Sequence, residues 1–275
     1  MRRVVVTGLG TINPLGSNTE ESWDSLINSK SGISKITKFE TDNYPCKIAG
    51  SIDDTSINTD IVSPRDQRKI DRFITLGLIA AEEAIKDSGF VSENEKSFRS
   101  GVMVGSGIGG LDTIYRNSSI LDNHGLRKIS PFFIPSSLIN LLSGHISIKY
   151  NLKGPNSSPV TACATGTHAI GDSFTLIKNN KADLMVCGGA EAAICPLGIS
   201  GFSAARALCD SFNDEPEKGS RPWDRDRSGF VMGEGSGVLV LEELEHAKKK
   251  KCSNLWRSER LWTLWRCISY HKTLR

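Results

Sequence analysis

Cys163 is the residue whose surroundings most favour chemistry in this sequence of 275 residues. The run Pro159–Ala162 predicts a strand that ends at the cysteine, and the pattern of Thr165–Lys178 predicts a helix directly after it. The neighbours are small enough to admit a substrate, and a helix N-terminus offers free N–H groups and positive charge that favour a thiolate. The turn therefore predicts a nucleophile, with a buried structural cysteine as the alternative.

A cysteine nucleophile usually works with a base, and the histidines offer no convincing one. His145 and His168 fall on predicted helices, where a structural role is expected. His246 falls on a charged face that should be solvated, and His124 in a polar loop. The fifth, His271, lies close to the C-terminus.

A glycine-rich segment, Gly105–Gly110, satisfies the G-x-G-x-x-G pattern and follows a predicted strand. The pattern alone suggests a dinucleotide site. Such a site also needs a second strand that ends in an acidic residue about 20 residues later. The corresponding stretch, Arg116–Ser130, is polar and its acidic residue, Asp122, follows no strand. We therefore favour the alternative, a tight loop that the backbone needs for a close approach.

Composition and charge exclude several classes of protein. The sequence is 38% hydrophobic and 24% charged, as in soluble globular proteins, and contains no apolar run near 18 residues. The net charge of +3 is too small to indicate nucleic-acid binding. No signal peptide is recognisable, so we expect a cytoplasmic protein. The cysteines are odd in number and lack a C-x-x-C motif, so we expect no disulfide framework and no zinc site: Cys46, Cys163, Cys187, Cys195, Cys209, Cys252 and Cys267. We also expect no other metal and no cofactor.

Basic residues gather in two places, at positions 65–72 and 127–128. One interpretation is a solvated surface, and the other is a docking patch for an acidic partner. Nucleic acid fits poorly because no aromatic residues alternate with these charges.

The predicted elements alternate between short strands and amphipathic helices, which indicates an α/β layered fold. Gly89 should end the most regular helix, and apolar strands should be covered on both faces. Strands are expected at Val4–Thr7, Gly101–Val104, Pro159–Ala162 and Leu184–Cys187, and an edge strand or a loop at Lys47–Ile52. Phe230–Met232 and Val238–Leu241 should form a hairpin around the glycine-rich segment between them. Helices are expected at Glu20–Asn28, Arg68–Ser88, Pro135–Tyr150, Thr165–Lys178 and Glu242–Lys251.

The sequence around Cys163, TACATG, resembles the active-site signature of the β-ketoacyl-acyl-carrier-protein synthases. Further segments agree with this family in order, from residue 1 to about 250: VVVTGLG, GSGIGGL, SPFF, GGAE, AARAL, RPWD and GEG. The elongating type II enzymes of bacterial fatty acid synthesis are the most similar subfamily.

This resemblance implies a thiolase-like, layered αβαβα fold built from two similar halves, in a homodimer. It implies that Cys163 takes an acyl chain from acyl carrier protein as a thioester. Malonyl-carrier protein then loses CO2, and its carbanion attacks the thioester to give a 3-oxoacyl product. Ile108, Phe133 and Phe202 would line the acyl pocket.

The resemblance also places the docking site for the acidic carrier protein on Arg65, Arg68, Lys69 and Arg127. It assigns two catalytic histidines, a lysine and a gating phenylalanine loop to a second half. We therefore expect this chain to be the N-terminal half only. The alternative to an active enzyme is an inactive remnant or a non-catalytic partner subunit that lacks those histidines.

The last residues are expected to differ in kind from the rest. Lys248–Lys251 implies a run of adenines, where a frame can slip. Reading one base later turns the codons of Trp256, Trp262 and Trp265 into glycine codons, and suitable codons give a continuation that resembles the family. We therefore expect a synthase domain at 1–251 and an out-of-frame tail at 252–275. The alternative is a genuine C-terminus that diverges from the family.

Overall fold

A five-stranded sheet runs through the centre of the computed structural model, which describes residues 2–91 and 97–249. The expected tail at 252–275 lies outside these residues. The strand order is β1 (Val4–Ile12), β7 (Gly235–Glu243), β6 (Leu184–Glu191), β4 (Ser100–Gly105) and β5 (Asn156–Ser157). The strand β4 is parallel to β5 and β6, whereas β7 is antiparallel to both of its neighbours, β1 and β6.

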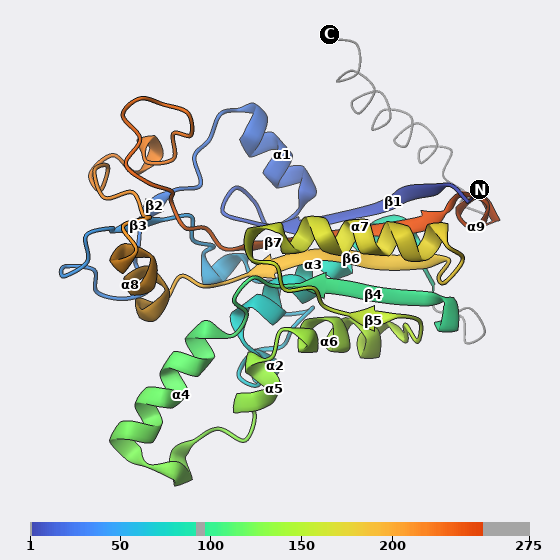
Figure 1. Ribbon diagram of the computed structural model, residues 1–275, viewed down its shortest axis with the longest axis horizontal. Coiled ribbons are helices and arrows are strands. Elements are labelled where there is room, and N and C mark those ends of the chain that lie inside the picture. The colour runs from blue at the N-terminus through green and yellow to red at the C-terminus, as the bar shows by residue number, and fades with distance from the viewer. Residues whose placement is uncertain (1, 92–96, 250–275) are drawn as a thin grey trace.

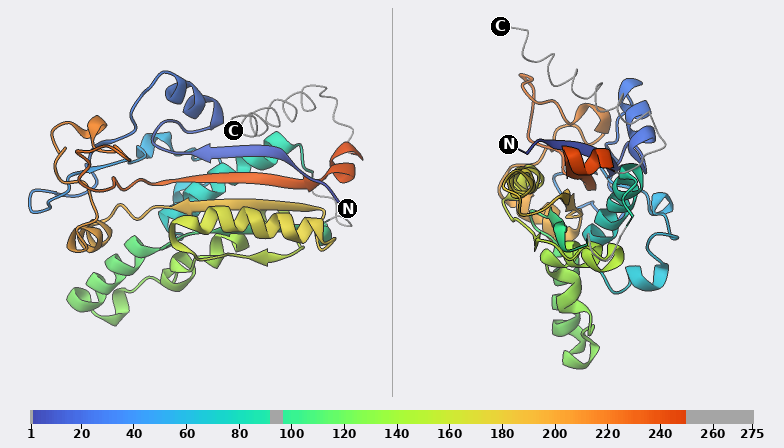
Figure 2. Two further views of the ribbon diagram at one scale, coloured as in Figure 1. Left: turned by 45° about the horizontal axis from the view of Figure 1, so that its top comes forward. Right: turned by 90° about the vertical axis from the view of Figure 1, so that its right-hand side faces the viewer.

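Helices cover both faces of this sheet, as the alternation of elements predicts (Figures 1 and 2). On one face, α3 (Arg72–Ser88) and α6 (Asn140–Tyr150) share a hydrophobic core with the strands. On the other face, α7 (Thr165–Lys178) packs its Ala169 and Ile177 against Met185 and Cys187 of β6. The α/β fold class is confirmed.

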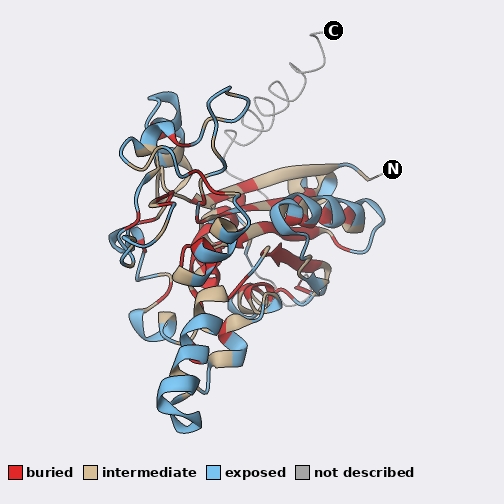
Figure 3. Ribbon diagram, turned by 60° about the vertical axis from the view of Figure 1, so that its left-hand side comes forward, coloured by how far each residue is buried: buried red, intermediate tan, exposed pale blue. Residues whose placement is uncertain are grey.

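The remaining elements lie around this sheet and the helices that cover it. They are α1 (Thr19–Ile27), β2 (Ser34–Lys35), β3 (Ile48–Ala49), α2 (Pro64–Gln67), α4 (Leu111–His124), α5 (Phe133–Ser137), α8 (Pro196–Ala204) and α9 (Leu244–Lys249), with 3-10 turns at Asp54–Ser56, Ser97–Arg99, Leu126–Lys128, Ala162–Ala164 and Pro216–Lys218. Figure 3 shows buried residues concentrated in the sheet and the helices on it, whereas the projecting helix α4 is mostly exposed. No helix in the described part of the chain is long and apolar enough to span a membrane.

The first strand is longer than the sequence predicts because it is built for contact with a helix. We expected Val4–Thr7, but β1 continues through two glycines to Ile12. A Cβ atom on Gly10 would lie 2.0 Å from the carbonyl oxygen of Ala80 in α3. The glycines are therefore where β1 and α3 touch, rather than a turn that ends the strand.

The strand expected at Pro159–Ala162 is wrong. The pairing of β5 with β4 ends at Ser157. The hydroxyl of Ser158 then donates to the carbonyl of Val104 at 2.8 Å, and Pro159 has no N–H to continue the ladder. Residues 158–161 therefore reach the cysteine as an irregular segment.

Two other expectations also need correction. The expected hairpin does not form, because β7 inserts between β1 and β6 while Phe230 forms a bridge with Leu208. The helix expected at Pro135–Tyr150 is divided into α5 and α6. The hydroxyls of Ser136 and Ser137 bond back to the carbonyl of Phe133, which ends the first turn.

The other boundaries shift by a few residues. Only Ile48–Ala49 of the expected segment Lys47–Ile52 pairs as a strand, and the final helix begins at Leu244 because β7 extends to Glu243. The helix α3 begins at Arg72 rather than Arg68, because the carboxylate of Asp71 caps it. Gly89 ends it in the left-handed conformation, as predicted.

Candidate active site

Cys163 lies in a 3-10 turn, Ala162–Ala164, that leads directly into α7. Its side chain is exposed, whereas Cys46, Cys187, Cys195 and Cys209 are buried. Burial raises the pKa of the Cys187 thiol to about 12, so that sulfur is inert at neutral pH. Among the described cysteines, Cys163 is the one that a substrate can reach.

The turn that presents Cys163 is tightly held. Ala162 has a φ of 52°, in the left-handed region that non-glycine residues rarely adopt. The hydroxyl of Thr165 accepts the N–H of Thr161 at 2.8 Å, which ties the irregular segment to the first turn of α7. The hydroxyl of Thr161 also lies 2.6 Å from Nδ1 of His168, so this histidine has the structural contact that we expected. The turn has the geometry of a nucleophile elbow, although no strand leads into it.

A cavity of about 660 Å³ opens beside Cys163. Ile108, from the glycine-rich segment, and Phe202, from α8, line it as predicted. Phe230 joins the lining, and its ring packs edge-on against that of Phe202 with centroids 5.3 Å apart. Phe133, the first residue of α5, is not part of this lining. The structure therefore brings Cys163 together with two of the three residues predicted for the acyl pocket.

The glycine-rich segment wraps around a carboxylate of the protein itself. One oxygen of Glu191 accepts the hydroxyl of Ser106 at 3.0 Å and the N–H of Gly109 at 3.3 Å. The other oxygen accepts the N–H of Ile108 at 2.8 Å. The donors that could hold a phosphate are thus used internally, so the close-approach interpretation of this loop is confirmed and a dinucleotide site is not supported.

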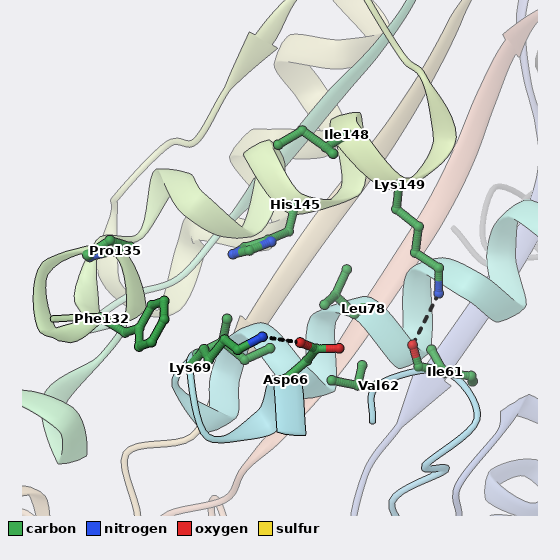
Figure 4. A pocket seen from close by; sticks show the side chains of 11 residues that line it. Ile61, Val62, Asp66, Lys69, Leu78, Phe132, Pro135, His145, Ile148 and Lys149 are labelled. Carbon is green, nitrogen blue, oxygen red and sulfur yellow. Dashed lines mark hydrogen bonds and ion pairs between the residues drawn. The ribbon is translucent and has the colours of Figure 1, made fainter. Parts of the chain in front are cut away.

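None of the histidines in the described residues lines the Cys163 cavity. His246 differs from our expectation, because it is half-buried and its Nδ1 lies 2.9 Å from a buried oxygen of Glu242. His145 lines a second cavity, of about 390 Å³, together with Lys69 and Phe132 (Figure 4). Burial lowers the pKa of His145.

The structure separates the predicted docking residues into two places. Arg65, Arg68 and Lys69 lie in α2 and directly after it, and Lys69 forms an ion pair with Asp66 at 2.7 Å. Arg127 lies in the turn after α4, a helix whose far end projects away from α2 (Figure 1). All four lie at the surface or close to it.

Sequence reasoning missed three charged residues close to the site, of which Glu234 is buried. Glu191 stands in the GGAE segment and Glu234 in the GEG segment, where the sequence shows them only as motif positions. Arg72 stands among the basic residues at positions 65–72, but it is half-buried and bonds to Glu234. For the two glutamates, the available signal was an acidic residue in a glycine-containing segment shortly after a predicted strand.

The central sheet with helices on both faces and a cysteine at the tip of α7 place the chain among the thiolase-like proteins. The chain belongs to the beta-ketoacyl synthase family, because residues 1–247 match the model of the beta-ketoacyl synthase N-terminal domain. It is 50% identical over 257 residues to "3-oxoacyl-[acyl-carrier-protein] synthase 2" of Rhizobium meliloti (strain 1021), covering 91% of this chain and 61% of that protein. The protein of the same name from Coxiella burnetii is 49% identical over 252 residues, with coverages of 92% and 60%.

Solved structures show the same fold. A beta-ketoacyl synthase from Burkholderia phymatum STM815 is 29% identical, with a TM-score of 0.80, over 92% of this chain and 62% of its own. A ketosynthase in complex with its type II polyketide acyl-carrier protein is 28% identical, with a TM-score of 0.77, over 90% of this chain and 60% of its own. The chain thus spans about 60% of the length of these relatives.

Proposed function

We propose that the protein acts as a 3-oxoacyl-[acyl-carrier-protein] synthase whose nucleophile is Cys163. The cysteine sulfur attacks the carbonyl of an acyl thioester on the carrier, and the carrier's sulfur leaves and takes up the proton that Cys163 lost. The acyl group is then held as a new thioester. Malonyl-carrier protein next loses CO2, and its carbanion attacks this thioester to release Cys163 and a 3-oxoacyl chain two carbons longer.

One observation carries the proposal: the exposed cysteine at the start of α7 opens into a cavity with largely apolar walls. Ile108 and Phe202 offer the apolar surface that an acyl chain needs. The relatives whose printed name is 3-oxoacyl-[acyl-carrier-protein] synthase 2 support the same activity. We also propose residues 1–251 as the synthase domain, in a cytoplasmic homodimer.

We extend the proposal to the carrier protein. Arg65, Arg68 and Lys69 would attract an acidic partner, and Arg127 would contact it from a separate site. The neighbour solved with its own acyl-carrier protein supports a partner of this class. The attraction should weaken as salt rises, because these side chains are at or near the surface.

A second candidate is a non-catalytic partner subunit, and a specific observation favours it. No histidine among the described residues lines the cavity, although the charge that develops when malonyl thioester loses CO2 needs donors. Acylation without condensation would support this candidate.

The full chain should be incubated with octanoyl-carrier protein and analysed by intact and peptide mass spectrometry. We expect one octanoyl group, on the peptide that contains Cys163, and none in Cys163→Ala. The buried Cys187 and Cys195 serve as internal controls within the same sample. Release of CO2 from malonyl-carrier protein then distinguishes the two candidate functions, because an active synthase releases CO2 and a non-catalytic partner subunit does not. Wild-type protein that gains no octanoyl group on Cys163 would refute the proposed nucleophile.

A further inference from the structure

One buried carboxylate, that of Asp71, accepts hydrogen bonds from the first turns of two helices, α3 and α4. Asp71 is 3% exposed, and its Oδ1 accepts the N–H of Phe73 at the start of α3. Its Oδ2 accepts both the N–H and the hydroxyl of Thr113, at 3.1 and 2.6 Å. Thr113 lies in the first turn of α4, whose own N-cap, Gly110, has no side chain that could do this. Asp71 therefore fixes the start of α4, directly after the loop that carries Ile108.

The next residue, Arg72, contacts a second segment of the cavity lining. Its Nε donates to Oε2 of Glu234 at 3.0 Å, and its Nη2 donates to Oε1 at 3.1 Å. The side chain of Glu234 is fully buried, and Lys38 bonds to its Oε1 at 2.5 Å. Glu234 stands between Gly233 and Gly235, which both line the cavity. Arg72 therefore fixes the segment that follows Phe230.

These two contacts start from neighbouring residues on a rigid support. The helix α3 is buried over most of its length and packs against β1, β6 and β7. Because tight packing prevents α3 from moving, the residues that bond to its first turn are held in fixed positions.

We propose that Asp71 and Arg72 are positioning residues that set the distance between the two walls of the Cys163 cavity, and thereby its preference among acyl chains of different length. The identity of the occupant, an acyl chain, rests on the proposed function. The spacing itself does not, because it follows from the contacts of α3 with Thr113 and Glu234. Loosening either contact lets one wall move and removes apolar contact from the longer chains first, because those chains reach furthest along the walls.

The test uses full-length protein with Thr113→Val, which removes the hydroxyl contact but keeps the backbone one, and with Arg72→Lys, which keeps the charge but loses the two-pronged donor. The matched control is Arg99→Lys. Arg99 bonds to Asp183 through Nε at 2.5 Å and through Nη2 at 3.0 Å, but precedes β4 at the end of that strand remote from Gly105 and the cavity.

Each variant is labelled at Cys163 with a series of N-alkylmaleimides from methyl to decyl, a reaction that requires no catalysis. We expect both test variants to lower the ratio of decyl to methyl labelling rates by on the order of fivefold. Arg99→Lys should leave this ratio unchanged even where it lowers stability. Test variants that are folded by circular dichroism and keep the wild-type ratio would overturn the proposal.

A second measurement, acylation of Cys163 from carrier proteins loaded with short and long chains, separates the two proposals. If wild-type protein accepts no acyl group, the proposed function fails while the maleimide series still decides the spacing. If acylation occurs and the test variants show the wild-type chain-length profile, the positioning role fails alone.

Discussion

Replacing Glu191 with glutamine should open the loop that carries Ile108. The carboxylate accepts three hydrogen bonds, from Ser106, Ile108 and Gly109. A glutamine oxygen at Oε1 can keep those of Ser106 and Gly109, but its NH2 group then faces the N–H of Ile108. A hydrogen bond to a charged acceptor contributes about 1.5–3 kcal/mol, so the loop should lose about 2 kcal/mol.

Amide hydrogen exchange measures this loss directly. A change of about 2 kcal/mol is roughly a 30-fold change in the opening equilibrium, so the amides of Ile108 and Gly109 should exchange roughly 30-fold faster in Glu191→Gln. In urea unfolding, the free energy of unfolding should fall by about the same 2 kcal/mol if the loop opens only when the whole domain unfolds. It should fall by less if the loop opens locally. Acylation of Cys163 should slow in parallel, because Ile108 lines the cavity.

The control is Glu217→Gln, an exposed carboxylate in the turn Pro216–Lys218. It makes the same chemical change at the surface and should alter the free energy of unfolding by less than about 0.5 kcal/mol. If Ile108 and Gly109 exchange at the wild-type rate in Glu191→Gln, the carboxylate does not hold the loop and our reasoning is wrong.

Three further predictions concern stability. Arg99 holds the pKa of Asp183 at about 2, below the 3.8 of the unfolded chain, so Asp183→Asn should cost about 1–2 kcal/mol at pH 7 after allowance for solvent screening. That stabilisation is complete above pH 3.8 and disappears as the pH falls through 2, so urea unfolding of wild type and variant should converge there. Burial lowers the pKa of His145, so wild-type protein loses stability as the pH falls below 6.5, the usual pKa of histidine. The drop in thermal unfolding temperature between about pH 7 and pH 5 should therefore be smaller for His145→Gln than for wild type. Gly10→Ala should destabilise by about 3 kcal/mol in a urea titration, because the added methyl meets the backbone of Ala80.

The parts of the fold that the sequence predicts well are those with local causes. The helix α7 has the predicted bounds, and α3 ends at Gly89 as predicted, because periodicity and a left-handed glycine act within a few residues. Cys163 and its small neighbours form the expected turn for the same reason.

The parts that could not be predicted depend on contacts between distant residues. Glu191 lies more than 80 positions from the loop that it holds, and Arg72 is 162 positions from Glu234. Nothing near Arg72 in the sequence distinguishes it from the exposed Arg68. The strand expected before Cys163 does not form, because the hydroxyl of Ser158, rather than a backbone N–H, donates to the carbonyl oxygen of Val104.

The left-handed conformation of Ala162 has a consequence for how this protein could evolve. The left-handed backbone of Ala162 lowers the stability of the folded protein by about 1–2 kcal/mol, a cost that glycine would avoid. Glycine would also increase the conformational entropy of the unfolded chain, which lowers stability by about 0.5–1 kcal/mol. A library selected for thermal stability alone should therefore accumulate glycine at position 162. Selection for reaction at the adjacent Cys163 should retain alanine, since its side chain restricts the turn that aims the sulfur. Selection for thermal stability and selection for reactivity would then favour different residues at position 162.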